Sequence, residues 1–145
     1  IKMKQTGRLT ITDDRMTRFW ITLDQGVNFV LDCLKNMVGG EIFVPKIPSM
    51  KIIDLAKAIA PEAELDIVGI RPGEKLHELM ITYDDARHTL EFDQYFVITP
   101  EFNWWGNKLN GGRRLPEKFE YSSETNSEWL SIGQLNEMIS SFNNH

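Results

Sequence analysis

Residues 41–70, EIFVPKIPSMKIIDLAKAIAPEAELDIVGI, predict the fold class of this 145-residue chain. A short apolar run at 41–46 and a second one at 64–70 have the composition of strands. Between them we expect a helix at about 50–60, capped by Ser49. Its buried face would comprise Ile52, Leu55, Ala56 and Ile59. A strand, a helix and a strand in this order predict a βαβ unit, with parallel strands and a right-handed crossover.

Elements on both sides extend this pattern. We predict a strand at 8–12, a helix at 23–37 with Thr22 as its N-cap, and a strand at 94–99. One face of the helix at 23–37 is apolar through Val27, Val30, Leu31, Leu34 and Met37.

Near the C-terminus, Ser131 and Gln134 have the spacing of a capping box, which predicts the start of a last helix. The apolar stripe of that helix is Leu135, Met138, Ile139 and Phe142. The whole chain, 1–145, is thus predicted to be one α/β domain that ends in a loose extension from about 100 to 145. Within the extension we expect the aromatic pair Trp104–Trp105 to anchor a loop.

Composition excludes several classes of partner. The chain is 41% hydrophobic, which is sufficient for a core, and 16 Lys and Arg against 21 Asp and Glu leave a net charge of −5. No basic cluster matches a nucleic acid, and no apolar run is long enough for a membrane span, so neither partner is expected. The lone Cys33 cannot form an internal disulfide, which favours a cytoplasmic location.

The sequence GIRPGEKLHELM at 69–80 carries the main candidate site. Arg71 follows the predicted strand, Pro72 and Gly73 turn the chain, and we expect a short helix to begin near Glu74. A guanidinium matches a phosphate with two parallel hydrogen bonds, and a carboxylate accepts hydrogen bonds from hydroxyl groups such as those of a ribose. The pair is therefore interpreted as a site for the diphosphate and ribose of a nucleotide sugar. The alternative is a surface ion pair between the two side chains.

Other candidates are weaker. Arg18 has the setting of a solvated loop arginine, but a second arginine near Arg71 would suit a diphosphate. His77 and Glu78 begin an H-E-x-x-H pattern, yet Ile81 stands in place of the second histidine, so no metal site is expected. The chain contains no G-x-S-x-G, no G-x-G-x-x-G and no Tyr-x-x-x-Lys. We therefore expect no catalytic residue and no bound cofactor in these residues.

Four segments together resemble a known family. They are ITDDRMTRFWITLDQGVNFVL, GGEIFVPKIPSMKIIDLAKAIAP, GIRPGEKLHELM and FEYSSETNSEWLS. From about Leu9 to Phe142 the chain resembles the C-terminal part of the inverting UDP-N-acetylglucosamine 4,6-dehydratases, which are extended short-chain dehydrogenase/reductase enzymes of the pseudaminic-acid and capsule type.

The resemblance implies a two-part lyase. An N-terminal Rossmann domain, absent from this chain, would bind NADP and carry a Thr-Asp-Lys and Tyr-x-x-x-Lys catalytic set. The C-terminal part would bind the UDP moiety. The product would be a UDP-4-keto-6-deoxy-L-hexose for surface polysaccharide or flagellin glycosylation.

The resemblance also implies roles for particular residues. Arg71 corresponds to an arginine that contacts the pyrophosphate, Glu74 to its acidic partner at the ribose, and Arg18 to a second phosphate-contacting arginine. The strand before Arg18 would lie along the uracil. Its residues nearest the base would be Leu9, Ile11 and Thr12.

Two hypotheses follow for this chain. In the first, it is the UDP-binding part of such a dehydratase and is inactive alone, and it begins at Ile1 in what we interpret as the last turn of a helix that starts elsewhere. In the second, it is a non-catalytic binding or assembly module from a split or degenerate gene. In either case we expect faces left bare by a missing Rossmann domain to promote self-association, and thus an oligomer.

Overall fold

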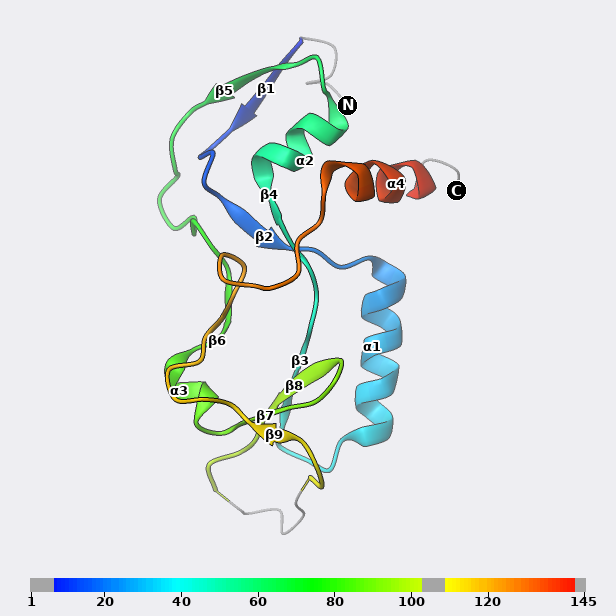
Figure 1. Ribbon diagram of the computed structural model, residues 1–145, viewed down its shortest axis with the longest axis vertical. Helices are drawn as coiled ribbons and strands as arrows, with labels where there is room; N and C mark the ends of the chain where they lie inside the picture. Colours follow the sequence, from blue (N-terminus) through cyan, green and yellow to red (C-terminus); the bar gives the residue numbers. More distant parts are fainter. Residues whose placement is uncertain (1–6, 103–108, 143–145) are drawn as a thin grey trace. The chain divides into compact units, whose positions relative to one another are not determined.

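The computed structural model describes residues 7–102 and 109–142 of the chain (Figure 1). The predicted loop anchor Trp104–Trp105 and the first six residues lie outside this part. The fold is mixed α/β, and the chain forms two compact units. Unit 1 consists of 1–20, 48–78 and 123–145, and unit 2 of 21–47 and 79–122.

The described part of unit 1 contains two short strand pairs and two helices. Strand β1 (Arg8–Ile11) runs parallel to β5 (Glu64–Ile67), and β2 (Thr17–Phe19) runs antiparallel to β4 (Ser49–Lys51). Helix α2 (Ile52–Ile59) packs against α4 (Ile132–Phe142), as Figure 1 shows. The core of the unit consists of Ile11, Met16, Met50, Ala56, Ala60 and Leu135.

Unit 2 is built on an antiparallel sheet with the strand order β3–β8–β7–β9. The bounds of its strands are Ile42–Pro45 for β3, Tyr95–Ile98 for β8, Thr89–Glu91 for β7 and Arg113–Arg114 for β9. A separate ladder joins β6 (Leu79–Ile81) to β10 (Tyr121–Ser122). The two helices of the unit are α1 (Leu23–Asn36) and the single turn α3 (Tyr83–Ala86).

Two predicted helix caps and two predicted strands are confirmed. Thr22 caps α1 in a capping box, because its hydroxyl accepts from the Gln25 backbone N–H at 3.2 Å and its own N–H donates to the Gln25 side chain at 3.0 Å. Ser131 and Gln134 form the corresponding pair of bonds, at 3.3 and 2.9 Å, at the start of α4. The strands predicted at 8–12 and 94–99 are β1 and β8.

The predicted βαβ unit at 41–70 is wrong. Its first strand, β3, pairs antiparallel with β8, whereas its second, β5, pairs parallel with β1. The two strands belong to different units, since the chain leaves unit 2 after Ile47 and forms the extra strand β4 before α2. Ser49 lies in β4, fully buried, so it is not the N-cap of α2; its hydroxyl accepts from the Asn126 side chain at 3.0 Å. Periodicity identifies strands but not their hydrogen-bonding partners.

The C-terminal segment is not a loose extension. Tyr121 and Ser122 form β10 and are buried, and Ser123 and Leu135 have no exposed surface. The prediction failed because the buried contacts of this segment are made to β6 and α2, which precede it by tens of residues. Within residues 7–102 and 109–142, no helix is long and apolar enough to cross a bilayer.

Candidate functional site

The carboxyl ends of the parallel strands β1 and β5 lead into the two segments that carry the candidate site. Thr12 directly follows β1, and the turn at 71–74 follows β5. The Thr12 hydroxyl donates to a carboxylate oxygen of Glu74 at 3.2 Å. The structure therefore brings these two predicted site residues together at a strand edge where ligands of α/β sheets commonly bind.

The turn itself differs from the prediction, because no helix begins at Glu74. The Glu74 N–H donates to the Arg71 carbonyl oxygen at 3.0 Å, and Gly73 has a φ of 82°, which favours glycine. The second carboxylate oxygen of Glu74 accepts from the Arg71 backbone N–H at 3.1 Å. The Glu74 carboxylate thus accepts two hydrogen bonds from groups of the same unit, the Thr12 hydroxyl and the Arg71 backbone N–H. After the turn the chain continues to strand β6 and not into a helix.

The Arg71 guanidinium is available to a ligand. The residue is exposed, and in the described part of the chain its side chain makes no hydrogen bond or ion pair. Glu74 contacts the Arg71 backbone and not its guanidinium, so the alternative of a surface ion pair between the two side chains is not formed. An unpaired guanidinium beside a carboxylate of fixed orientation can bind an anion that carries neighbouring hydroxyl groups.

Arg18 has a different environment, because its guanidinium is bonded to the protein. Its acceptors are the carbonyl oxygens of Thr17, Lys75 and Leu76 at 2.6, 2.8 and 3.1 Å and the sulfur of Met16 at 3.1 Å. Its Nε lies 3.4 Å from a carboxylate oxygen of Glu78. The side chain therefore joins β2 to residues 75–78. A phosphate that binds this guanidinium competes with these acceptors.

Leu9 and Ile11 lie on the more buried face of β1. Ile11 is only 6% exposed and belongs to the core of unit 1, and Leu9 is half-buried. Asp13, just beyond Thr12, accepts from the Arg15 side chain at 2.8 and 2.9 Å. These bonds hold the pKa of the Asp13 carboxyl at about 2, so this end of β1 carries an ionised carboxylate and a guanidinium at neutral pH.

Sequence reasoning missed a hydrogen-bonded network next to this site. His77 Nδ1 lies 2.8 Å from the Thr17 hydroxyl, which lies 2.7 Å from the Ser123 hydroxyl. The sequence interpretation considered His77 only as a metal ligand. No spacing rule connects residues that are 60 and 106 positions apart. Among the described residues, no group of three His, Cys, Asp or Glu side chains is placed to hold a metal ion.

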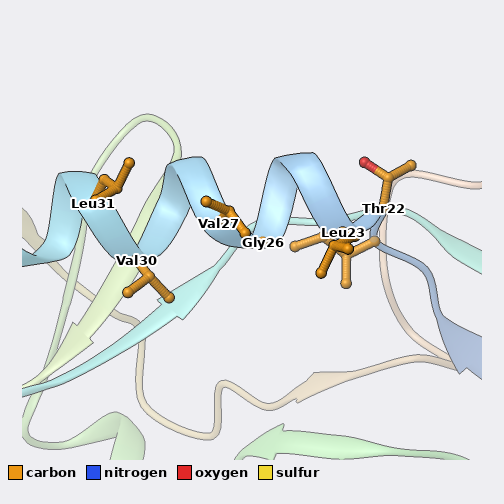
Figure 2. Close-up of a pocket in the computed structure, with 7 residues that line it drawn as sticks. Thr22, Leu23, Gly26, Val27, Val30 and Leu31 are labelled. Atoms are coloured by element: carbon orange, nitrogen blue, oxygen red, sulfur yellow. The ribbon is translucent and has the colours of Figure 1, made fainter.

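The predicted apolar face of α1 is exposed. The five residues of this face have 49% to 61% of their surface exposed, and no residue of the helix is buried. The first turns of α1 and the preceding Ile21 line a surface hollow of about 570 Å³ (Figure 2). On another side of the helix, the ring of Phe29 contacts Tyr95 of β8, with centroids 6.3 Å apart. One side of α1 thus packs on its own unit, and the apolar stripe does not.

Comparison with protein families gives a match over most of the chain. Residues 1–100 match the model of a family described as polysaccharide biosynthesis protein. The chain belongs to this family.

Individual relatives carry more specific names. A UDP-N-acetylglucosamine 4,6-dehydratase (inverting) from Campylobacter jejuni is 50% identical to this chain in an alignment of 142 positions that covers 90% of the chain and 42% of the relative. A UDP-glucose 4-epimerase from Rickettsia canadensis is 29% identical over 98% of the chain and 43% of the relative.

A solved structure supports the fold. The X-ray structure of Pen from Bacillus thuringiensis matches with a TM-score of 0.82 at 26% identity, and the match covers 98% of this chain and 44% of that one. The chain therefore spans less than half the length of the relatives it matches.

Proposed function

We propose that this chain binds the UDP end of a nucleotide sugar within a UDP-N-acetylglucosamine 4,6-dehydratase. The observation that carries the proposal is that, in the described part of the chain, the Arg71 guanidinium makes no hydrogen bond or ion pair and shares a turn with the bonded carboxylate of Glu74, at the carboxyl edge of β1 and β5. The name of the Campylobacter relative supports the class of substrate.

Each site residue has a role that suits its surroundings. Arg71 binds the diphosphate through the paired N–H groups of its guanidinium. Glu74 accepts from ribose hydroxyls through the lone pairs that Thr12 and the Arg71 backbone leave open. Arg18 contributes a second positive charge, and β1 with Leu9 and Ile11 borders the uracil.

In the whole enzyme, NADP bound to a Rossmann domain would supply the redox chemistry of the dehydration. We assign no cofactor-binding or catalytic residue to this chain, which has no dinucleotide fingerprint. Its part is to hold the UDP moiety while the sugar reacts elsewhere. The product would be a UDP-4-keto-6-deoxy-L-hexose for surface polysaccharide or flagellin glycosylation in the cytoplasm, with pseudaminic acid as one destination.

A titration of the chain with UDP tests this function. We expect UDP to shift the backbone amide NMR signals of residues 9–12, 15–18 and 71–76, and to leave those of α3 unchanged. ADP at the same concentrations is the control for general binding of a diphosphate. A titration in which UDP moves none of the signals of 71–76, or moves them no more than ADP does, contradicts the proposal.

The exposed face of α1 has a role in the same proposal. We propose that it packs against the Rossmann domain of the whole enzyme, since apolar stripes of this kind are buried in stable proteins. The same face is the observation that favours the second candidate function, a non-catalytic assembly module. Sequencing the DNA upstream of Ile1 separates the two, because only the dehydratase has a continuous frame with G-x-G-x-x-G and Tyr-x-x-x-Lys.

The chain by itself is expected to self-associate through this face. The double variant Val30→Glu and Leu34→Glu places two charges on residues that are 57% and 61% exposed, so we expect it to remain monomeric without loss of helix. Asn28→Glu, at an exposed position on the same helix, is the matched control and should associate like the wild type. Light scattering over a range of concentrations measures the effect. A wild-type chain that stays a monodisperse monomer at high concentration contradicts the expectation.

A further inference from the structure

A chain of hydrogen bonds in unit 1 connects three segments that are far apart in sequence. Ser123 accepts from the Glu78 backbone N–H at 2.9 Å, and its hydroxyl lies 2.7 Å from that of Thr17. Thr17 in turn lies 2.8 Å from His77 Nδ1, and His77 Nε2 lies 3.5 Å from a Glu124 carboxylate oxygen. Thr17 is 3% exposed and Ser123 is 0% exposed, so water does not compete for these hydroxyls.

The number of donors sets the direction of this chain. Each hydroxyl has one proton to donate. Since Thr17 is the one acceptor within hydrogen-bonding distance of the Ser123 hydroxyl in the described part of the chain, the Ser123 proton is directed to Thr17, and the Thr17 proton is directed to His77 Nδ1. His77 Nδ1 therefore acts as an acceptor, and the ring proton is on Nε2, which faces Glu124. A proton on Nδ1 would reverse the chain and leave the buried Ser123 hydroxyl without an acceptor, which is costly.

The same segments are joined by backbone bonds. The Thr17 N–H donates to the Leu76 carbonyl oxygen at 3.1 Å, and the Ser123 N–H donates to the Glu78 carbonyl oxygen at 2.8 Å. Residues 75–78 are thus held from two sides, and they are the residues whose carbonyl oxygens and carboxylate surround the Arg18 guanidinium. Any movement of this segment moves Arg18 and the end of the 71–74 turn.

We propose that His77, acting through the hydroxyls of Thr17 and Ser123, is a positioning residue that fixes residues 75–78 and with them the guanidinium of Arg18 for the diphosphate. The proposal rests on the proposed function for its ligand, but the fixing of the segment stands on the bonds alone. If packing were the only role of these three positions, apolar side chains would be sufficient. In the chain from Ser123 through Thr17 to His77, each hydroxyl donates to the next side chain. Such an ordered chain of hydrogen bonds specifies the orientation of residues 75–78.

The variant Thr17→Val tests the proposal, because it keeps the shape of the side chain and removes only the hydroxyl. We expect the amide of Glu78 to exchange with solvent about tenfold faster, as for a weakened buried hydrogen bond. The affinity for UDP should fall about tenfold, while that for uridine, which lacks the phosphates, changes less than about twofold. Thr125→Val, the same change at an exposed position outside the proposed UDP site, is the control and should behave like the wild type.

A second pair of variants covers the case in which Thr17→Val does not fold. His77→Asn keeps an acceptor near the position of Nδ1 and should retain most of the UDP affinity, whereas His77→Leu removes it and should lose affinity as Thr17→Val does. The ¹⁵N shift of the His77 ring reports directly which nitrogen carries the proton. A protonated Nδ1 in the neutral ring overturns the proposal.

Two further results separate this inference from the proposed function. If the wild-type chain does not bind UDP but Glu78 exchanges faster in Thr17→Val, the proposed function is wrong and the fixing of residues 75–78 is supported. If the wild type binds UDP and Thr17→Val binds it equally well, the positioning role is wrong and the proposed function stands.

Discussion

Replacing Arg71 by alanine should lower the affinity of the chain for UDP by about tenfold to a hundredfold. The loss corresponds to one charge-assisted hydrogen bond to a phosphate, about 1.5–3 kcal/mol, at about 1.4 kcal/mol for each factor of ten. Because the exposed Arg71 side chain makes no hydrogen bond or ion pair in the described residues, the variant should unfold like the wild type. Calorimetric titration with UDP measures the affinity, and a thermal melt measures the stability.

Two further variants separate charge from geometry. Arg71→Lys keeps the positive charge but loses the two parallel N–H groups, so we expect an affinity between those of the wild type and Arg71→Ala. Arg87→Ala removes the same side chain from an exposed pair with Asp84 in the other unit and should leave UDP binding unchanged. Equal affinities for the wild type and Arg71→Ala would remove the central assignment of the site.

Replacing Leu135 by alanine should destabilise unit 1 by about 2–5 kcal/mol, the range for removing a buried leucine side chain. Leu135 is 0% exposed and lies in α4, the helix that packs against α2. Its loss leaves a cavity in the core of unit 1. Urea denaturation followed by circular dichroism measures the change in the free energy of unfolding.

The matched control for this variant is Leu23→Ala. Leu23 is 77% exposed at the start of α1, so the same substitution should change stability by less than about 0.5 kcal/mol at concentrations where the chain is monomeric. If Leu135→Ala were as mild as Leu23→Ala, then α4 would not contribute to the core, and the segment after residue 100 would after all be a loose extension.

The success of the sequence analysis was greatest where the relevant interaction spans three or four residues. The N-cap at Thr22 and the capping box of Ser131 with Gln134 are formed as predicted. These bonds lie within one turn of helix, so the local order of residues is sufficient to specify them. The turn at Arg71 was also predicted, although Glu74 folds back on the Arg71 backbone instead of starting a helix.

The pairing of strands could not be predicted from local sequence patterns. Strands β3 and β5 were both recognised, but the partner of each is a segment that the periodic pattern does not identify. The stripe on α1 was predicted as an apolar face, and only the structure reveals that the described chain leaves it exposed.

The sequence by itself determined the positions of the three longest helices and of strands β1, β3, β5 and β8, two helix caps, and the guanidinium and carboxylate of the 71–74 turn, because each depends on neighbouring residues. Only the tertiary structure decided which strands pair, that Arg18 is bonded to residues 75–78, and that His77, Thr17 and Ser123 form one hydrogen-bonded chain. The physical reason is that the bonds of Arg18 to residues 75–78, and those of Thr17 to His77 and Ser123, join residues 57 to 106 positions apart, and a bond of that kind exists only when the whole unit has folded.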